Sequence, residues 1–190
     1  GLVRAGIVRV EKSQVYRNPV KKYENTDEKK KLTSEQETIV SEMLKGYDDG
    51  NPKTYLLHGI TGSGKTEVYI RLIEEMVRRG KQAIVLIPEI ALTYQTLMRF
   101  YKHFGDRVSV LNSTLSAGEK YDQCERAKHG EIDVIIGPRS ALFTPFPDLG
   151  LIVMDEEHEG SYKSEGTPKY HTRETAQELA QRVGASLVLE

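Results

Sequence analysis

One stretch, residues 57–66, constrains this chain more than any other part of its sequence. It fits the pattern G-x-x-x-x-G-K-[ST], in which glycines let successive backbone N–H groups surround an oligophosphate. The apolar run before it predicts a strand, and the amphipathic stretch at residues 67–79 predicts a helix whose N-terminal dipole favours anions. A glycine-rich turn before an ordinary helix is the alternative, and an acidic motif further along the chain argues against it. The stretch therefore predicts a nucleoside triphosphate site.

Within this loop, different residue types have different expected roles. Lys65 is expected to place its ammonium group on the β- and γ-phosphates, and the Thr66 hydroxyl is expected to ligate Mg²⁺. The remaining phosphate-cradle residues are Gly59, Thr61, Gly62, Ser63 and Gly64.

The acidic motif lies at residues 149–158. Its almost unbroken apolar part predicts a strand buried on both faces, and Asp155 and Glu156 follow at the end where an open α/β sheet presents its ligand crevice. Asp155 can hold the Mg²⁺ that Lys65 and Thr66 help to place, and Glu156 can orient and deprotonate the attacking water. A strand followed by an acidic helix N-terminus would look similar. Because strand and helix patterns alternate between the two motifs, we favour the catalytic interpretation.

The rest of the chain continues this alternation. A helix begins near residue 32, with Thr33 or Ser34 as N-cap and Gln36 or Glu37 as its capping-box partner. Strands are predicted at residues 54–57, 82–87, 107–111, 133–136, 149–154 and from 186, and further helices at 67–79, 90–104, 116–128 and 172–182. This order predicts an α/β fold with three layers, a mostly parallel sheet covered by helices on both faces.

Charge is distributed unevenly along a chain whose formal net charge is −1. Residues 1–31 carry nine Lys/Arg against four Asp/Glu, and the remainder carries eighteen against twenty-four. Local patches, not bulk charge, must therefore hold any polyanion on the main body. The single cysteine, Cys124, excludes an internal disulfide and argues against a cysteine-based zinc site. With no membrane-length apolar run and no signal-peptide pattern, we expect a cytoplasmic protein.

Three segments are expected along the chain. Residues 1–20 hold two short β-like runs that read as the remnant of a preceding domain. Residues 21–31 have a linker composition; their lysines could touch phosphates, but a solvated tether is favoured. Residues 32–190 form the main domain.

The two motifs together resemble motifs I and II of superfamily-2 DExH helicases, and the flanking sequence is closest to the PriA-type replication-restart helicases, also called primosomal protein N′. The matching stretches lie at residues 57–66, 87–93, 137–143, 155–159, 161–163 and 170–173. The resemblance covers the chain from about residue 32 to its end, and residues 1–20 resemble the tail of the winged-helix domain that precedes the helicase lobes. It implies a RecA-like P-loop NTPase lobe, the first of two, that uses ATP and Mg²⁺ in a 3′-to-5′ DNA helicase acting in restart of stalled forks and primosome assembly.

Site residues follow from this resemblance position by position. Lys65, Asp155, Glu156 and His158 would form the catalytic set, with His158 linking motif II to the segment that senses DNA. Gln36 resembles the glutamine that reads the adenine edge, which is compatible with a capping-box role.

A second group of positions resembles the nucleic-acid motifs. Glu89 and Thr93 resemble the motif Ia loop that lies along the bound strand, although Pro88-Glu89 alone would indicate helix initiation. Arg139 and Ser140 resemble the motif that contacts the DNA backbone or braces that contact, and a surface or salt-bridged Arg139 is the alternative.

Residues 161–173 resemble the aromatic-rich loop that couples DNA contact to hydrolysis in RecQ and PriA helicases. Its rings and cations suit single-stranded bases and backbone. The candidates are Tyr162, Tyr170 and His171 for stacking, with Lys163, Lys169 and Arg173 as cations. Gly160, Gly166 and Pro168 would make the loop mobile. Alternatively, the tyrosines pack against the sheet edge.

The sequence also departs from the family pattern. Pro138 stands where the family usually has threonine, and Cys124 where tryptophan is expected. No Thr-Ala-Thr type motif III follows Glu190, so we expect the second lobe, its arginine finger and a cysteine-rich zinc module to lie outside this chain. The chain alone is then expected to bind nucleotide weakly without unwinding DNA.

The expected partners are single-stranded and forked DNA, with primosome and single-strand-binding proteins joining in the full-length protein. Two other functions stay open: a lobe of another superfamily-2 DNA translocase, and a nucleotide-sensing interaction module without turnover.

Overall fold

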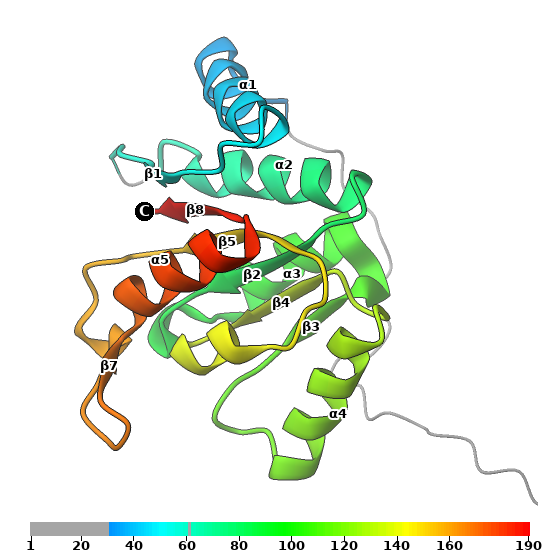
Figure 1. The fold of residues 1–190 in the computed structure, drawn as a ribbon, viewed down its shortest axis with the longest axis vertical. Helices are drawn as coiled ribbons and strands as arrows, with labels where there is room; N and C mark the ends of the chain where they lie inside the picture. The colour runs from blue at the N-terminus through cyan, green and yellow to red at the C-terminus, as the bar shows by residue number, and fades with distance from the viewer. Residues whose placement is uncertain (1–30, 61) are drawn as a thin grey trace, which may run out of the picture.

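Six parallel strands form the centre of the computed structural model, which describes residues 31–60 and 62–190 (Figure 1). Their order across the sheet is β1-β8-β5-β2-β4-β3, and every neighbouring pair is parallel. The strands are β1 (Thr54–Leu56), β2 (Gln82–Leu86), β3 (Val108–Val110), β4 (Val134–Gly137), β5 (Leu149–Met154) and β8 (Ser186–Leu189). Every residue of β2, β3, β4, β5 and β8 is buried, as expected for a parallel sheet covered on both faces.

Helices cover both faces of this sheet. They are α1 (Ser34–Asp48), α2 (Lys65–Arg78), α3 (Tyr94–Phe104), α4 (Ala117–Lys128) and α5 (Thr172–Val183). On β2, Ala83 and Val85 point into a core shared with α1, α2 and α3, whereas Ile84 and Leu86 point into a core shared with α4 and α5. Successive side chains of a strand point to opposite faces, so each strand contributes to both cores. The three-layer α/β fold with a parallel sheet, predicted from the alternation, is confirmed.

The parallel arrangement gathers the motifs at one edge of the sheet. The phosphate-loop residues follow β1, Asp155 follows β5, and Glu190 follows β8, which lies between those two strands. The carboxyl ends of parallel strands share one edge, where open α/β sheets bind their ligands. Figure 1 shows β8 running out between β5 and the segment of β1 and α2, with the chain end beside it.

Local signals explain most of the helix boundaries. Thr33 caps α1, and both bonds of the capping box with Gln36 are present. Gly80, with φ of 73°, follows α2 in the left-handed conformation that ends many helices. These two features agree with the sequence-based expectation.

One predicted helix starts in the wrong place. The helix expected at residues 90–104 begins only at Tyr94, after a single 3₁₀ turn, η1 (Glu89–Ala91). Thr93 has extended backbone angles, and its hydroxyl accepts a hydrogen bond from the Thr96 N–H. Thr93 is therefore the N-cap of α3, and its side chain stops the helix from extending towards Pro88.

Several short elements were not predicted. They are η2 (Gly105–Arg107), η3 (Arg139–Phe143), η4 (Gly160–Tyr162) and an antiparallel hairpin of β6 (Lys163–Ser164) and β7 (Tyr170–His171). The hairpin occupies the segment expected to be a mobile loop. The predictions for residues 1–20 and for the linker up to residue 30 lie outside the described residues. Within the described part of the chain, no helix has the length and apolar character needed to cross a membrane.

Candidate nucleotide site and nucleic-acid surface

The phosphate loop connects β1 to α2. Gly62 and Gly64 both have φ of 83°, and Gly64 stands directly before the first residue of α2. This left-handed conformation strains residues with a Cβ, which is why the loop needs glycine there. The first turn of a helix leaves its backbone N–H groups without intrahelical acceptors, so the loop and α2 present donors suited to an anion. Thr61 lies outside the described residues, and its role stays a prediction.

Lys65 is held by its own loop. Its Nζ donates to the carbonyl oxygen of Gly59 at 2.7 Å and lies 3.4 Å from that of Ile60. It also lies 3.4 Å from Oε1 of Glu190. The ammonium group is thus positioned beside the mouth of the loop, in contact with oxygens that a phosphate could replace.

Asp155 and Glu190 form a carboxyl pair beside Lys65. Burial raises the pKa of Asp155, opposed by a hydrogen bond with Glu190 and by the nearby Lys65 charge. Burial and then the Asp155 charge raise the pKa of Glu190 to about 7. The pair can therefore share one proton when no cation is bound, as closely placed carboxyls commonly do.

Glu190 was not among the predicted site residues. The available signal was its place directly after the apolar run of β8, because a residue at that place reaches the same sheet edge as Asp155. Its backbone N–H donates to the carbonyl of Met154, and its carbonyl accepts from Glu157. These two bonds join the end of β8 to the acidic motif on both sides of Asp155.

Glu156 has an unusual backbone. Its φ of 50° is the only positive value recorded for a non-glycine residue in the described part of the chain. Such a conformation costs about 1–2 kcal/mol for an L-residue, and strain of this kind clusters at functional sites. The Glu156 carboxylate is exposed and lies 3.5 Å from Nε2 of His158, which is also exposed. The predicted water-activating and linking roles of these two residues stay predictions.

Gln36 joins α1 to the phosphate loop. Its Oε1 accepts from the Thr33 N–H, while its Nε2 donates to the carbonyl of Ser63 at 3.1 Å and lies 3.5 Å from that of Gly64. A Cβ on Gly64 would come within 2.6 Å of this Nε2. The capping-box interpretation is confirmed, and the adenine-reading role stays a prediction.

The prediction that Tyr162 stacks on a nucleic-acid base is wrong for this structure. Its ring is 1% exposed, so in this structure it offers no face for stacking on a base. Its hydroxyl lies 2.7 Å from the carbonyl oxygen of Asp155 and 3.0 Å from that of Leu86, and Thr172 donates to its carbonyl. The alternative, packing of a tyrosine against the sheet edge, is correct here. Tyr162 is the last residue of η4, directly before the hairpin. It therefore connects the hairpin segment, defined as residues 160–171, to the backbone of the acidic motif.

Arg139 braces the same segment. Its Nη1 donates to the carbonyls of Ser161 at 2.8 Å and Lys163 at 3.0 Å. Both partners are uncharged backbone groups, so neither the salt-bridged alternative nor a free surface arginine describes it. Ser140, next in η3, is exposed.

Glu89 also bonds inward. Its carboxylate accepts the Ser113 N–H at 2.8 Å, and hydrogen bonding to Ser113 lowers the pKa of Glu89. Together with Thr93, which caps α3, Glu89 therefore shapes the loop region after β2. A cavity of about 330 Å³ lies between these loops, lined by Pro88, Glu89, Asn112, Ser113, Lys120, Pro138, Arg139, Ser140, Ser161 and Tyr162.

The remaining hairpin residues lie apart from that cavity. A second cavity, of about 610 Å³, lies between the hairpin and α5 and is lined by Lys163, Ser164, Glu165, Lys169, Tyr170, His171 and Glu174. Tyr170 packs edge-on against Phe143 of η3, with ring centroids 5.4 Å apart. The predicted DNA residues thus fall into two neighbouring groups, joined by Arg139.

At the start of α5, two predicted residues take local roles. The His171 ring accepts from the Arg173 N–H and caps the helix. Arg173 pairs with Glu157 at 3.2 Å, which links α5 to the acidic motif.

The two departures from the family pattern are accommodated locally. Pro138 precedes η3 in an extended conformation, and its carbonyl accepts from the Ala141 N–H. Cys124 is partly buried on α4, where burial raises the pKa of its thiol. Among residues 31–60 and 62–190, no group of three or more His, Cys, Asp or Glu side chains is arranged to hold a metal ion.

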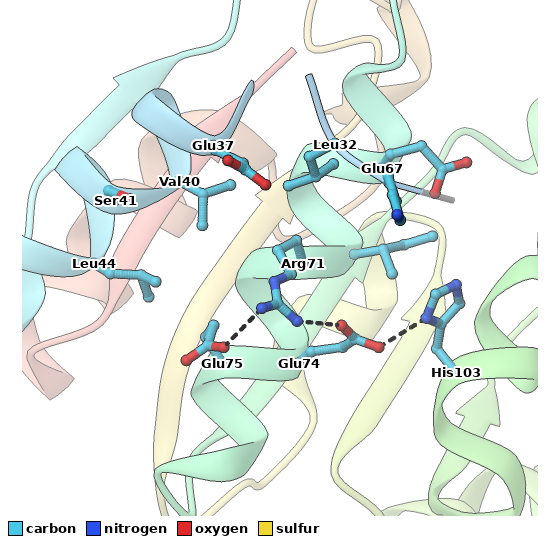
Figure 2. A pocket seen from close by; sticks show the side chains of 12 residues that line it. Leu32, Glu37, Val40, Ser41, Leu44, Glu67, Arg71, Glu74, Glu75 and His103 are labelled. Carbon is cyan, nitrogen blue, oxygen red and sulfur yellow. Dashed lines mark hydrogen bonds and ion pairs between the residues drawn. The ribbon is translucent and has the colours of Figure 1, made fainter. Parts of the chain in front are cut away.

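A third cavity, of about 520 Å³, lies beside α2 on the face that meets α1 and α3 (Figure 2). Figure 2 shows Arg71 bonded to Glu74 and Glu75, and Glu74 bonded in turn to His103 of α3. These charged groups pair with one another within α2 and between α2 and α3. We therefore interpret the cavity as part of the contact between these helices and not as a ligand site.

The parallel sheet, the glycine loop before α2 and the carboxylates after β5 define the class: a RecA-like P-loop NTPase lobe. Comparison with known proteins agrees. The chain belongs to the family described as type III restriction enzyme, res subunit, whose model matches residues 29–190.

Similar proteins narrow this class. The chain is 44% identical over 190 residues to the replication restart protein PriA of Bacillus subtilis (strain 168), covering 99% of this chain and 24% of that protein. It is 49% identical over 135 residues to PriA of Synechocystis sp., covering 70% of this chain and 16% of the relative. The chain thus spans about a quarter or less of these relatives. The resemblance to PriA-type proteins, predicted from the motifs, is confirmed.

A solved structure also matches. The structure of RecG bound to a three-way DNA junction aligns with a TM-score of 0.62 and 26% sequence identity, covering 84% of this chain and 21% of that one.

Proposed function

We propose that this chain is the ATP-binding and ATP-hydrolysing lobe of a 3′-to-5′ DNA helicase that acts in replication restart and primosome assembly. The observation that carries the proposal is the convergence of Lys65 and Asp155 at one sheet edge, with Asp155 bonded through its carbonyl to the hairpin segment. The similarity to PriA proteins supports the restart role. Cytoplasmic location is part of the same proposal.

ATP binding would use the loop and Lys65. The loop carbonyls and Glu190 hold the Lys65 ammonium group close to where β- and γ-phosphates would lie, and the N-terminus of α2 adds its dipole. Gln36 stands beside the same loop, where an amide could reach a base edge.

Hydrolysis would use Asp155 and Glu156. The Asp155 carboxylate and the Thr66 hydroxyl are hard oxygen ligands, a donor set that fits Mg²⁺ held partly by substrate phosphates. When bound, Mg²⁺ would neutralise charge developing on the phosphate oxygens. Binding of a cation at Asp155 also favours the ionised form of its carboxyl, which opposes sharing a proton with Glu190. The Glu156 carboxylate, which is exposed beside His158, would accept a proton from the attacking water.

DNA binding would use the surface around the two cavities that are lined by residues of η1, η3 and the hairpin. Lys163, Lys169, Tyr170 and His171 give cations and rings around one cavity, and Lys120 and Arg139 line the neighbouring one. Single-stranded and forked DNA are the proposed substrates, with single-strand-binding and primosome proteins as partners of the intact protein.

Exposed apolar side chains at this edge support closure by a second lobe. Ile60, Ile90 and Tyr94 are each more than 75% exposed, at 82%, 86% and 76%. Ile60 follows β1, whereas Ile90 and Tyr94 follow β2, so exposed apolar side chains lie at two places along this sheet edge and suit a surface that another protein lobe covers. An arginine finger from such a lobe would explain why this chain alone should turn over ATP slowly.

A related function has one observation in its favour. Similarity to RecG on a DNA junction fits a duplex or branched-DNA translocase. Identity of 26% to RecG, against 44–49% to PriA proteins, favours the restart helicase. A nucleotide-sensing module without turnover has no comparable support. The experiment below distinguishes it from a helicase lobe, because only the helicase lobe hydrolyses ATP.

The test is Glu156→Gln in the intact protein. We expect ATP hydrolysis to fall by roughly 10²–10⁴-fold while ATP binding persists, since the amide cannot accept the proton of the attacking water. Glu178→Gln on α5, an exposed surface pair with Arg182, is the matched control. Unchanged turnover in Glu156→Gln, or no turnover in the unmodified protein with single-stranded DNA, would overturn the proposal.

A further inference from the structure

Tyr69 lies in the core one helical turn after Thr66. Both residues belong to α2 and, three positions apart, share one face of the helix. The Tyr69 hydroxyl is 3.3 Å from Oγ1 of Thr66, slightly longer than an ideal O–H···O bond. A buried phenol therefore reaches the hydroxyl that is proposed to ligate Mg²⁺.

The ring of Tyr69 is fixed by packing. It is 1% exposed and stacks on Phe100 of α3, with centroids 6.3 Å apart and the planes tilted by 15°. Apolar packing alone would be served as well by phenylalanine, whereas a buried hydroxyl needs a hydrogen-bond partner to offset the loss of water. Thr66 of α2 supplies that partner, and Phe100 of α3 packs against the ring. Contacts with both helices therefore fix the position of the phenol oxygen.

The chemistry of the Thr66 hydroxyl makes this contact useful. A hydroxyl oxygen has one proton and two lone pairs. Donation from Tyr69 occupies one lone pair, which leaves the other for a cation and holds the side chain in one rotamer. Threonine otherwise divides between two rotamers in helices, because its hydroxyl can turn to a backbone carbonyl.

We infer that Tyr69 is a positioning residue that orients the Thr66 hydroxyl for Mg²⁺. The inference rests on the proposed ATP- and Mg²⁺-dependent function. Groups that orient metal ligands in this way commonly change metal affinity or activity by 10–100-fold when removed. A role in packing alone would instead change stability and leave the metal dependence unaltered.

The experiment is a Mg²⁺ titration of nucleotide binding by the intact protein carrying Tyr69→Phe, followed with a fluorescent ATP analogue. The matched control is Tyr101→Phe on α3, which also removes a buried hydroxyl, one that has no hydrogen-bond partner in the described structure. We expect the Mg²⁺ concentration at half-maximal binding to rise about tenfold in Tyr69→Phe and to stay within twofold in Tyr101→Phe. Binding measured in EDTA should be the same in all three proteins.

Two results would overturn the inference: an unchanged Mg²⁺ midpoint in Tyr69→Phe, or an equal loss of binding with and without Mg²⁺. Thermal unfolding of both variants gives a second readout, since a folding defect lowers the melting temperature and leaves the Mg²⁺ midpoint in place. The proposed function fails separately, when the unmodified protein shows no Mg²⁺-dependent ATP binding.

Discussion

The phosphate loop and the hairpin meet at Asp155, but their functional groups are held in different ways. Lys65 bonds to a carbonyl six residues before it in the chain, and Gly64 leads directly into α2. In the hairpin region, Arg139 bonds to residues 22 and 24 positions away, and Tyr162 bonds to a carbonyl 76 positions away. The phosphate loop is therefore shaped mainly by contacts within a few residues, although Gln36 and Glu190 reach it from far along the chain, whereas the hairpin end depends on the assembled sheet.

The proposed function requires the hairpin and the nucleotide site to communicate, and the contacts of Asp155 offer one route. Asp155 faces Lys65 and Glu190 with its carboxyl group, and it accepts the Tyr162 hydroxyl with its carbonyl. A displacement of the hairpin would act on Tyr162 and so on the backbone that carries Asp155. Energetic coupling of this kind needs a contiguous set of contacts, and Tyr162 is the contact that joins the two regions.

Among the substitutions that test this comparison, the largest effect is expected in the phosphate loop. Lys65→Ala in the intact protein should weaken ATP binding by about 10- to 100-fold, because it removes charge-assisted hydrogen bonds to phosphate worth about 1.5–3 kcal/mol. Equilibrium binding of ATP checks this, with Lys128→Ala on the exposed face of α4 as control. If Lys65→Ala binds ATP as well as the control does, the loop is not the nucleotide site.

On the hairpin side, Tyr162→Phe should destabilise the protein by about 1–3 kcal/mol, since two buried carbonyls lose their shared donor. Chemical denaturation measures this, and Tyr101→Phe is the control for a buried hydroxyl without a partner. A loss equal to that of the control would mean that the phenol does not tie the hairpin to β5.

Tyr170 sharpens the distinction between the buried and the accessible tyrosine. Because it lines the hairpin cavity and is only half-buried, Tyr170→Ala should weaken single-stranded DNA binding by about 1–3 kcal/mol. Fluorescence anisotropy with a labelled oligonucleotide checks this, and Tyr121→Ala on exposed α4 is the control. Equal affinities for the two variants would contradict a stacking role for Tyr170.

A smaller effect should follow from Glu190. In the folded chain its pKa is about 7, against 4.5 for an ordinary glutamate, so the folded state holds its proton over a range where the unfolded chain has lost it. The free energy of unfolding should therefore fall as pH rises from about 4.5 through 7. Melting temperatures across this range, without nucleotide or Mg²⁺, check the slope. Glu190→Gln should flatten it, and an identical slope would show that another group causes it.

The nucleotide site and the hairpin region could be predicted from the sequence to different extents, for physical reasons. Residues 57–66 and Asp155 could be placed because glycine, lysine and strand patterns act within a few residues of each other. Tyr162 was expected as a stacking face, since a tyrosine among glycines and lysines carries no local mark of burial. Its burial depends on Leu86 and Thr172, which only the folded sheet brings near.

Two further differences have the same origin. Arg139 was expected to contact the DNA backbone or to brace that contact, with a surface or salt-bridged arginine as the alternative. Its actual acceptors are backbone carbonyls, which residue types cannot indicate. Glu190 was overlooked because its role depends on the strand order in the sheet. The sheet places β8 beside β5, although the hairpin and α5 separate these two strands along the chain.

The most direct test of the account is the ATP hydrolysis rate of Arg139→Ala in the intact protein, measured with and without saturating single-stranded DNA. Arg139 bonds to the hairpin backbone and not to the phosphate loop. We expect the ratio of the rate with DNA to the rate without DNA to fall by about tenfold, which corresponds to roughly 1.4 kcal/mol of lost coupling, while ATP affinity is retained. A ratio equal to that of the unmodified protein would contradict the claim that the hairpin connects DNA to Asp155.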